Sequence, residues 1–261
     1  MTVPSSPLRF YDDLAAEYHL LFDAWWEGAV WHGEVIGAEL RRVGAVPPAR
    51  LLDATCGIGT QAIPLAQQGF RVTGTDLSAL AIERAAHEAS TRGIEATFAV
   101  ADIRLVRASV EGSFEAVISC DNALAHLPEL EDLTTAFGSV RACLGDGGVF
   151  LASIRDYDAL AEEPSAGVVP VCYGPPGRRH IVGQSWTWSA DTSTVDIQLL
   201  ILREAGENWS ATVRETTMRA WRRTELEAAL GSAGFGRLEW REPEATGYLQ
   251  PILVAVAGRA A

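Results

Sequence analysis

Apolar positions in the first part of the chain recur every three or four residues, which is the period of an amphipathic helix. Residues 10–45 are therefore expected to be helical, and Pro47-Pro48 ends that part. Further along, short apolar runs alternate with helical patterns that Gly, Ser or Pro residues bound. Strands are predicted at 49–55, 70–76, 96–102, 114–120 and 149–155, and helices at 60–68, 79–92 and 128–144, with Pro128 as a first helical residue. This alternation predicts an α/β fold with a doubly wound, Rossmann-like parallel sheet.

The pattern changes after Asp156. Residues 160–180 are rich in Pro and Gly, and residues 145–148 before them read as a turn. Consecutive strands are predicted at 180–190, 193–204 and 211–221, followed by a helix with a capping box at Thr224 and closing strands at 236–243 and 248–258. We therefore expect three parts: an N-terminal helical segment (1–45), a core (46–156 with 223–261) and an antiparallel β insertion (157–222).

Composition narrows the class of protein. The 261 residues carry a formal net charge of -13 with no long basic run, which disfavours nucleic acid as the main partner. The four cysteines, at 56, 120, 143 and 172, are dispersed and show no zinc spacing, so no metal site is expected. Without a signal core or a run of 18 apolar residues, we expect a cytoplasmic protein that does not engage a membrane.

The stretch LLDATCGIGTQ places a carboxylate at the mouth of a glycine-rich turn. Ligands of a doubly wound sheet bind beyond the carboxyl ends of its strands, where this turn lies. The spacing Gly57-x-Gly59-x-x-Ala62 also fits a dinucleotide fingerprint, so an NAD-dependent oxidoreductase is one alternative. A pyrophosphate favours amide donors, however, and Asp53 would repel it. Asp53 therefore favours a cationic, phosphate-free adenosine derivative, S-adenosylmethionine.

The ends of the next strands supply groups for the rest of an adenosine. Asp76 ends the second predicted strand, where an acid can accept hydrogen bonds from both ribose hydroxyls. Asp102 and Ile103 end the third, placed for the edge and the face of an adenine.

Five segments in this order resemble the motifs of class I S-adenosylmethionine-dependent methyltransferases, above all the small-molecule branch around glycine N-methyltransferase. They are LLDATCGIG, VTGTDLS, FAVADIR, FEAVISCDNALAHL and LGDGGVFLASIRDYD. The chain departs from the first motif at Thr55, where the family usually has Gly or Ala. The resemblance implies S-adenosylmethionine as cofactor, S-adenosylhomocysteine as product and a small-molecule acceptor; a homo-oligomer is compatible with it.

The resemblance also implies a set of cofactor-binding residues, in which the N-terminal segment acts as a lid over the ligand. They are Tyr11, Tyr18, Trp26, Asp53, Thr55, Cys56, Gly57, Asp76, Leu77, Asp102, Ile103 and Cys120.

For the acceptor, the resemblance implies that Asn122 touches it and that Arg155 binds its carboxylate. An arginine at a strand end can bind a carboxylate with two parallel hydrogen bonds. The alternative for Arg155 is a structural ion pair with Asp121, Asp156 or Asp158.

Three histidines are candidate general bases, because His accepts protons near neutral pH. His126 follows the fourth strand, where it would otherwise anchor the loop, and His32 and His180 lie in the lid segments.

Aromatic side chains are the remaining candidates for the acceptor site. Trp186 and Trp188 are two residues apart and share one face of a strand, where they either wall the site or pack the lid on the core. Tyr157 and Tyr248 are further candidates, the latter with a turn contact as its alternative.

The sequence thus predicts methyl transfer to the nitrogen of an amine or amino-acid-like acceptor. The alternatives are C-methylation of an electron-rich ring such as an indole, then O-methylation.

Overall fold

The computed structural model describes residues 6–258. Its helices are α1 (Pro7–Leu14), α2 (Trp25–Arg42), α3 (Ala62–Gln67), α4 (Ala79–Thr91), α5 (Val106–Ser109), α6 (Leu130–Cys143), α7 (Tyr157–Glu162), α8 (Arg223–Ser232) and α9 (Pro243–Thr246), with short 3-10 turns η1 (Tyr18–Leu21), η2 (Ile103–Leu105) and η3 (Ala123–His126). Its strands are β1 (Arg50–Asp53), β2 (Arg71–Asp76), β3 (Thr97–Val100), β4 (Phe114–Ser119), β5 (Leu144–Ser153), β6 (Gly167–Tyr173), β7 (His180–Trp188), β8 (Thr194–Ala205), β9 (Asn208–Arg219), β10 (Phe235–Arg241) and β11 (Ile252–Ala257).

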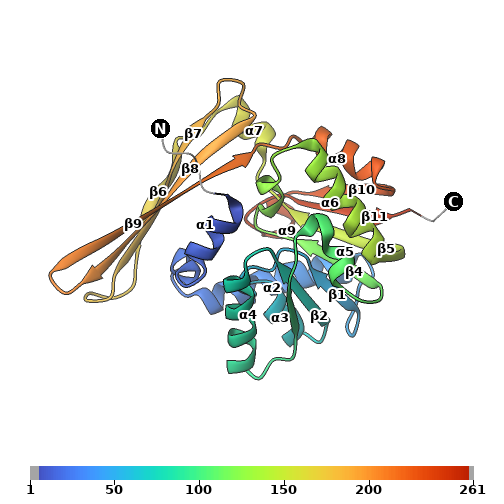
Figure 1. The fold of residues 1–261 in the computed structure, drawn as a ribbon, viewed down its shortest axis with the longest axis horizontal. Coiled ribbons are helices and arrows are strands. Elements are labelled where there is room, and N and C mark those ends of the chain that lie inside the picture. Colours follow the sequence, from blue (N-terminus) through green and yellow to red (C-terminus); the bar gives the residue numbers. More distant parts are fainter. Residues whose placement is uncertain (1–5, 259–261) are drawn as a thin grey trace.

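A seven-stranded sheet in the order β10-β11-β5-β4-β1-β2-β3 forms the core (Figure 1). Strands β1 to β5 pair in parallel, whereas β11 runs antiparallel between β5 and β10. The expected doubly wound α/β fold is therefore confirmed. The strand order reverses at β1, the topological position where such sheets bind ligands.

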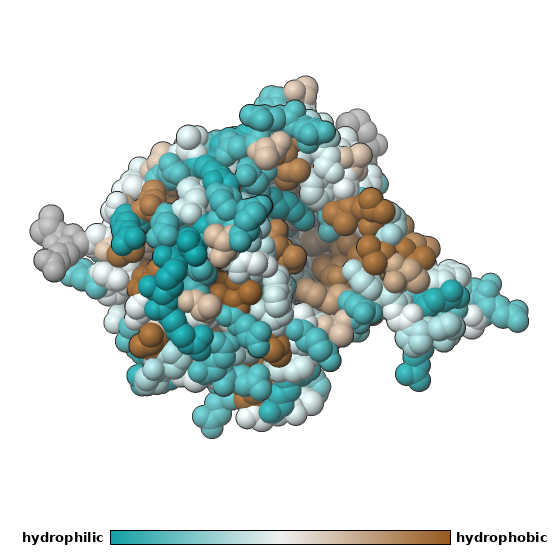
Figure 2. All heavy atoms as spheres, turned by 180° about the vertical axis from the view of Figure 1, so that it is seen from behind, coloured by the Kyte–Doolittle hydropathy of each residue, from teal (hydrophilic) through white to brown (hydrophobic). Residues whose placement is uncertain are grey.

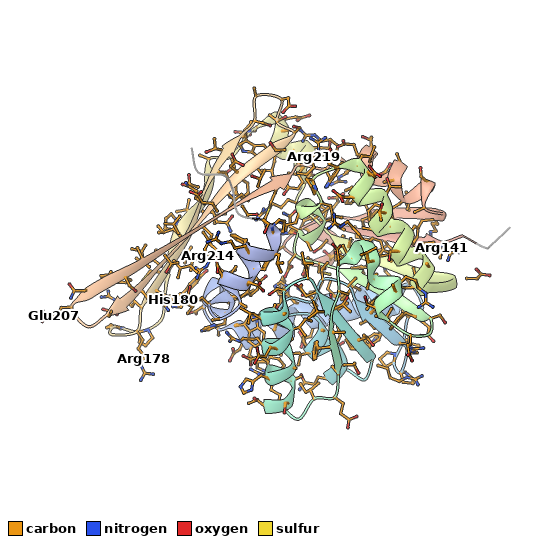
Figure 3. The ribbon with its side chains drawn as sticks, viewed as in Figure 1. Arg141, Arg178, His180, Glu207, Arg214 and Arg219 are labelled. Carbon is orange, nitrogen blue, oxygen red and sulfur yellow. The ribbon has the colours of Figure 1, made fainter. Side chains whose placement is uncertain are left out.

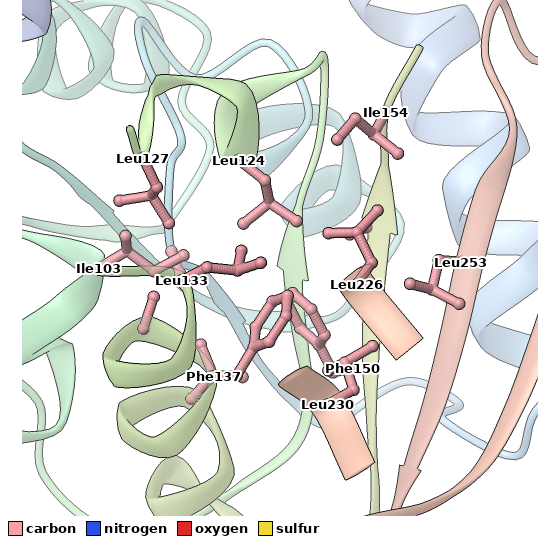
Figure 4. Packing of buried hydrophobic residues seen from close by; sticks show 14 of the residues in the cluster. Ile103, Leu124, Leu127, Leu133, Phe137, Phe150, Ile154, Leu226, Leu230 and Leu253 are labelled. Atoms are coloured by element: carbon pink, nitrogen blue, oxygen red, sulfur yellow. The ribbon is translucent and has the colours of Figure 1, made fainter. Parts of the chain in front are cut away.

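Both faces of this sheet are buried, so its strands are short apolar runs. Leu51 and Leu52 of β1 are both fully buried, in different hydrophobic clusters. Leu51 packs with residues of α2 and α3, and Leu52 with residues of α6 and α8. In the second cluster the rings of Phe137 and Phe150 meet edge to face at 5.7 Å (Figure 4).

The insertion forms a separate antiparallel sheet in the order β6-β7-β8-β9, which stands beside the core with α1 between them (Figure 1). Strand β8 alternates in burial, as expected for a sheet covered on one face. Its buried Leu199 and Ile201 pack against Phe10 and Leu14 of α1. A hollow separates the insertion from the core, and the side of this hollow that the insertion forms is apolar (Figure 2).

The stretch over residues 10–45 that was expected to be helical consists of three helical pieces, α1, η1 and α2, rather than one continuous helix. Phe22 and Ala24 adopt extended backbone between η1 and α2. This break lets α1 pack on the insertion while α2 packs on the core sheet. Glu17 joins the first piece to the insertion by ion pairs with Arg203 at 2.6 Å and Arg214 at 2.5 Å, and Figure 3 shows Arg214 beside α1.

Several predicted boundaries also shift. Strand β6 lies in the stretch judged only Pro- and Gly-rich. Strand β5 already begins at Leu144, so it includes the turn predicted over residues 145–148. Helix α6 begins at Leu130 rather than Pro128. Helix α8 begins at Arg223. Its capping box joins Arg222 and Glu225 rather than starting at Thr224, because the Glu225 carboxylate accepts from the backbone N–H of Arg222.

Within residues 6–258, no helix combines the length and apolar character needed to cross a membrane.

The Phe137 side chain offers a test of the core. We expect Phe137→Ala to lower the free energy of unfolding by about 3–5 kcal/mol, because a cavity would remain between α6 and β5. Leu130→Ala on the same helix is the matched control, since Leu130 is 55% exposed; it should change the free energy of unfolding by about 0.5 kcal/mol or less. Urea unfolding measures both, and equal effects would contradict this packing.

Candidate active site

A cavity of about 350 Å³ opens at the carboxyl ends of β1, β2 and β4 and is lined on another side by α1. Many of the residues predicted for the site line it. They are Tyr11, Tyr18, Thr55, Cys56, Gly57, Asp76, Leu77, Asp102, Ile103, Cys120 and His126. Both tyrosines reach the cavity although the helix between them is broken.

The glycine turn after β1 is fixed by backbone geometry. Gly59 has a φ of +92°, and a Cβ there would lie 2.5 Å from Ile63, so only glycine fits. Gly57 also has a positive φ, and its N–H donates to the Asp76 carboxylate at 2.9 Å. This bond ties the turn after β1 to the end of β2.

Asp76 is held by hydrogen bonds at both carboxylate oxygens. The second oxygen accepts from the Ser78 backbone N–H at 2.9 Å. Burial raises the pKa of Asp76, and the two backbone hydrogen bonds oppose that rise. Because a carboxylate offers about four acceptor sites, both oxygens retain a free lone pair toward the cavity. The arrangement suits a vicinal diol such as that of a ribose.

The loop after Asp76 also contacts the N-terminal segment. The Ser78 hydroxyl, which caps α4, donates to Asp12 of α1 at 2.6 Å. The same loop therefore contacts both the Asp76 carboxylate and α1.

Asp102 both lines the cavity and caps η2. It accepts from the backbone N–H of Arg104 at 2.9 Å and from the guanidinium of the same residue at 2.5–3.0 Å. Burial alone would raise the pKa of Asp102, but the hydrogen bonds from Arg104 outweigh it and hold the pKa below its usual value. Arg104 in turn pairs with Asp132 at 2.5 Å. Capping of η2 therefore leaves Asp102 in the lining of the cavity.

The structure does not bring Asp53 to the cavity. Its side chain is 1% exposed and accepts only a long bond from the Thr55 N–H at 3.4 Å, and one carboxylate oxygen has no partner among the described residues. Burial raises the pKa of Asp53 to about 8. It is therefore mostly protonated at neutral pH and is poorly suited to hold a cation. The Thr55 hydroxyl, within the cavity wall, bonds to Ser119 at 2.9 Å.

His126 and Tyr11 form a hydrogen-bonded pair in the cavity wall, with 2.8 Å between the tyrosine hydroxyl and Nε2. Burial, with a smaller effect of Arg155, lowers the pKa of His126 to about 4. Burial also raises the pKa of Tyr11. At neutral pH both groups are uncharged, and Nδ1 of His126 is left without a partner among residues 6–258.

Asn122 is buried behind the cavity wall rather than in it. It adopts a left-handed conformation with a φ of 67°. Its amide oxygen accepts from the Arg155 backbone N–H at 3.2 Å, and its amide nitrogen donates to the Tyr157 hydroxyl at 2.9 Å. The side chain therefore joins the turn after β4 to the end of β5.

Arg155 also lies outside the lining set, yet its charge acts on the site. It helps to lower the pKa of His126, and it opposes the rise in pKa that burial causes at Tyr11 and Tyr157. Its guanidinium lies 4.8 Å from the ring centre of Trp186. Among the described residues, no carboxylate lies within the 4.0 Å of an ion pair to Arg155, so the structural alternative for this residue is not formed.

The predicted tryptophans lie outside the cavity. Trp186 and Trp188 pack against the core cluster, and the Trp188 indole N–H donates to the Ser165 carbonyl at 2.8 Å. Trp26 lies under the Arg92 guanidinium, 4.1 Å from the ring centre. These contacts are those of packing residues.

Tyr248 and the two alternative bases are likewise buried away from the lining. Tyr248 stacks on Trp31 with ring centres 5.7 Å apart, and its hydroxyl bonds to His32 at 2.8 Å. His180 lies on β7 against Tyr173. Neither histidine is among the cavity residues.

Sequence reasoning missed further lining residues, most of which lie within the motifs. They are Ser6, Pro7, Leu8, Ala54, Thr60, Gln61, Ser78, Ala101, Arg104, Asp121, Ala123, Leu124, Leu127 and Pro128. Asp121 directly follows β4, so the end-of-strand rule that found Asp76 could have found it.

Comparisons with known proteins show what the chain is similar to. Residues 51–148 match the family model described as a methyltransferase domain. The chain also aligns in structure with an S-adenosylmethionine-dependent methyltransferase from Clostridium acetobutylicum, with a TM-score of 0.75 and 18% identity over 95% of this chain and 99% of the other. Residues 51–148 are therefore similar to methyltransferase domains, and the chain has the fold of an S-adenosylmethionine-dependent methyltransferase.

Two further similar proteins are informative. A glycine/sarcosine N-methyltransferase from Parasynechococcus marenigrum is 30% identical over 60% of this chain, which spans about half, 55%, of that relative. An amino pentose methyltransferase from Micromonospora echinaspora aligns with a TM-score of 0.75 and 20% identity, over 92% of this chain and 94% of the other.

Within residues 6–258, no group of three or more His, Cys, Asp or Glu side chains is arranged to hold a metal ion.

Asp76 offers the direct test of cofactor binding. We expect Asp76→Ala to weaken S-adenosylhomocysteine binding at least about tenfold, because hydrogen bonds to a charged group contribute about 1.5–3 kcal/mol each. Isothermal titration measures the affinity, and Asp146→Ala, whose side chain is 64% exposed, is the control. An unchanged affinity would show that Asp76 does not hold the ribose.

Proposed function

We propose that the protein transfers the methyl group of S-adenosylmethionine to the nitrogen of a small-molecule amine. The observation that carries this proposal is one cavity lined both by Asp76, placed for a ribose, and by the uncharged imidazole of His126. The cofactor supplies a methyl group activated by its sulfonium. A cytoplasmic location for the enzyme stays a prediction.

Different residues around the cavity would bind different parts of this cofactor. Asp76 and Leu77 would hold the ribose and its junction with adenine, and Asp102 with Ile103 the adenine. Backbone and side-chain groups of the glycine turn would surround the methionyl tail. Cys120, at the end of β4, would lie near the sulfonium. These assignments rest on the lining residues and on the order of the strand ends.

Methyl transfer requires an acceptor aligned with the sulfonium and a site that excludes water. The pair of Tyr11 and His126 supplies a buried, uncharged wall at which an amine can lose its proton. Burial keeps the imidazole unprotonated at neutral pH, so it can accept that proton, and its lowered pKa makes it a weaker base than a solvated histidine. Tyr11, bonded to Nε2, is a positioning residue for the ring.

Two observations favour an amine over an indole as acceptor. The similar proteins named above include enzymes described as acting on glycine, sarcosine and an amino pentose. No tryptophan of the described residues lines the cavity, whose aromatic walls are Tyr11, Tyr18 and His126. Support for an aromatic acceptor from a tryptophan-rich lid is therefore lost.

Arg155 supports an amino-acid-like acceptor within the amine class. A partly buried guanidinium that makes no ion pair with the described residues is a ready receptor for a carboxylate. Its positive charge also acts on the pKa values of Tyr11 and His126, two residues of the cavity wall.

His126→Ala tests the proposed base. We expect kcat to fall about 10²- to 10⁴-fold, the range of general base catalysis, while the S-adenosylhomocysteine affinity stays within about twofold. A release assay for S-adenosylhomocysteine with an amine acceptor measures the rate. His87→Ala, an exposed histidine of α4, is the control.

The pH profile adds a second readout for the same residue. Because the pKa of His126 is lowered to about 4, the base stays unprotonated from neutral pH down to that value. With an acceptor that is itself uncharged, kcat/KM should be retained until the pH approaches 4 and then fall. A wild-type inflection near 6.5 that disappears in His126→Ala would contradict the buried, uncharged state.

Arg155→Ala tests the acceptor class. We expect carboxylate-bearing amines to lose at least about tenfold in kcat/KM, since each charge-assisted hydrogen bond contributes about 1.5–3 kcal/mol. Amines without a carboxylate should change by about twofold or less. The panel also includes indoles and phenols, and the exposed Arg178→Ala is the control. Equal turnover of a neutral indole by wild type and variant would overturn the amino-acid-like acceptor.

A further inference from the structure

The carboxylate of Asp121 lies at the cavity wall next to Cys120, directly after β4. Asp121 has a φ of 57°, a left-handed conformation that costs energy for a residue with a side chain. Its side chain is 23% exposed. The chain thus holds an acid in an unfavourable backbone conformation at the edge of the site.

Two hydrogen bonds fix the orientation of this carboxylate. Tyr248 donates its hydroxyl to one oxygen at 2.7 Å, and Gln61 donates its amide to the other at 2.6 Å. Gln61 ends the glycine turn, whereas Tyr248 comes from the segment before β11. Each carboxylate oxygen keeps a lone pair beyond these bonds.

Within residues 6–258, no arginine or lysine forms an ion pair with Asp121. Among the described residues, the nitrogen within ion-pair range is Nδ1 of His32, at 3.6 Å. Burial lowers the pKa of His32 and outweighs the opposing effect of Asp121, so the imidazole is neutral at neutral pH. A carboxylate at the edge of a buried site without a paired charge is stabilised by a cationic ligand.

We propose that Asp121 binds the ammonium group of the methionyl tail of S-adenosylmethionine. This inference rests on the proposed function and adds a cofactor-binding residue to it. Gln61, which holds Asp121, lies in the same turn as Gly57 and lines the same cavity, on the side assigned to the methionyl tail. Asp53 is buried outside the cavity and mostly protonated, so it leaves the ammonium without an ionised partner.

Gln61 and Tyr248 act as positioning residues in this arrangement. Tyr248 is itself held by its stack on Trp31 and by its bond to His32. A carboxylate held in this way meets the ammonium without reorganisation, which strengthens binding.

The test compares two ligands that differ only in the charged group. They are S-adenosylhomocysteine and its analogue in which hydrogen replaces the amino group. For Asp121→Asn we expect at least a tenfold loss of affinity for S-adenosylhomocysteine by isothermal titration, and a change of twofold or less for the deaminated analogue. Tyr248→Phe should show a smaller loss with the same selectivity. Asp53→Asn, the matched acid control, should leave the ratio of the two affinities unchanged.

Three outcomes would overturn the inference. An equal loss for both ligands in Asp121→Asn would assign the residue a structural role. An unchanged affinity for S-adenosylhomocysteine with a raised KM for the acceptor would place the acceptor, and not the ammonium, at Asp121. No binding of S-adenosylhomocysteine to the wild-type protein would reject the proposed function itself, and the inference with it.

Discussion

The hydrogen bond from the Gly57 N–H to the Asp76 carboxylate joins the ends of two neighbouring strands, and the site is arranged around it. It requires a turn with positive φ after β1, which glycine supplies, and an acid at the end of β2. Because β1 lies where the strand order reverses, the turn faces an open crevice rather than a packed helix. The backbone of one strand and the side chain of the next thereby form one wall of the cavity.

The N-terminal segment completes this wall by contacts to both sheets. Asp12 accepts from Ser78 in the loop after Asp76, and Glu17 pairs with Arg203 and Arg214 of the insertion. These contacts hold Tyr11 at the cavity wall, where the charges of Asp76 and Arg155 act on its pKa in opposite directions. The break between η1 and α2 therefore allows the N-terminal segment to contact both sheets.

Much of the core could be predicted from the sequence, because parallel strands buried on both faces are short apolar runs separated by glycine, serine and proline. The same rule located Asp76 and Asp102, since strand ends converge on one edge of the sheet. The break at Phe22 and Ala24 in the N-terminal segment could not be predicted, because the apolar period of the sequence continues across these residues. Tertiary packing overrides the helical pattern there. Strand β6 was missed because its pairing with β7 is a long-range contact that Pro- and Gly-rich composition conceals.

Burial explains why the site residues were harder to assign than the fold. The sequence shows that Asp53, Asp76 and Asp121 each follow or end a strand, but it does not show how much water each retains. In the structure, Asp53 is 1% exposed and its pKa is about 8, whereas Asp121 keeps 23% of its side chain exposed and two hydrogen bonds. Desolvation without compensating hydrogen bonds raises the pKa of a carboxylate, as it does at Asp53. We therefore propose the acid at the cavity wall, rather than the acid of the glycine motif, as the partner of a cationic cofactor.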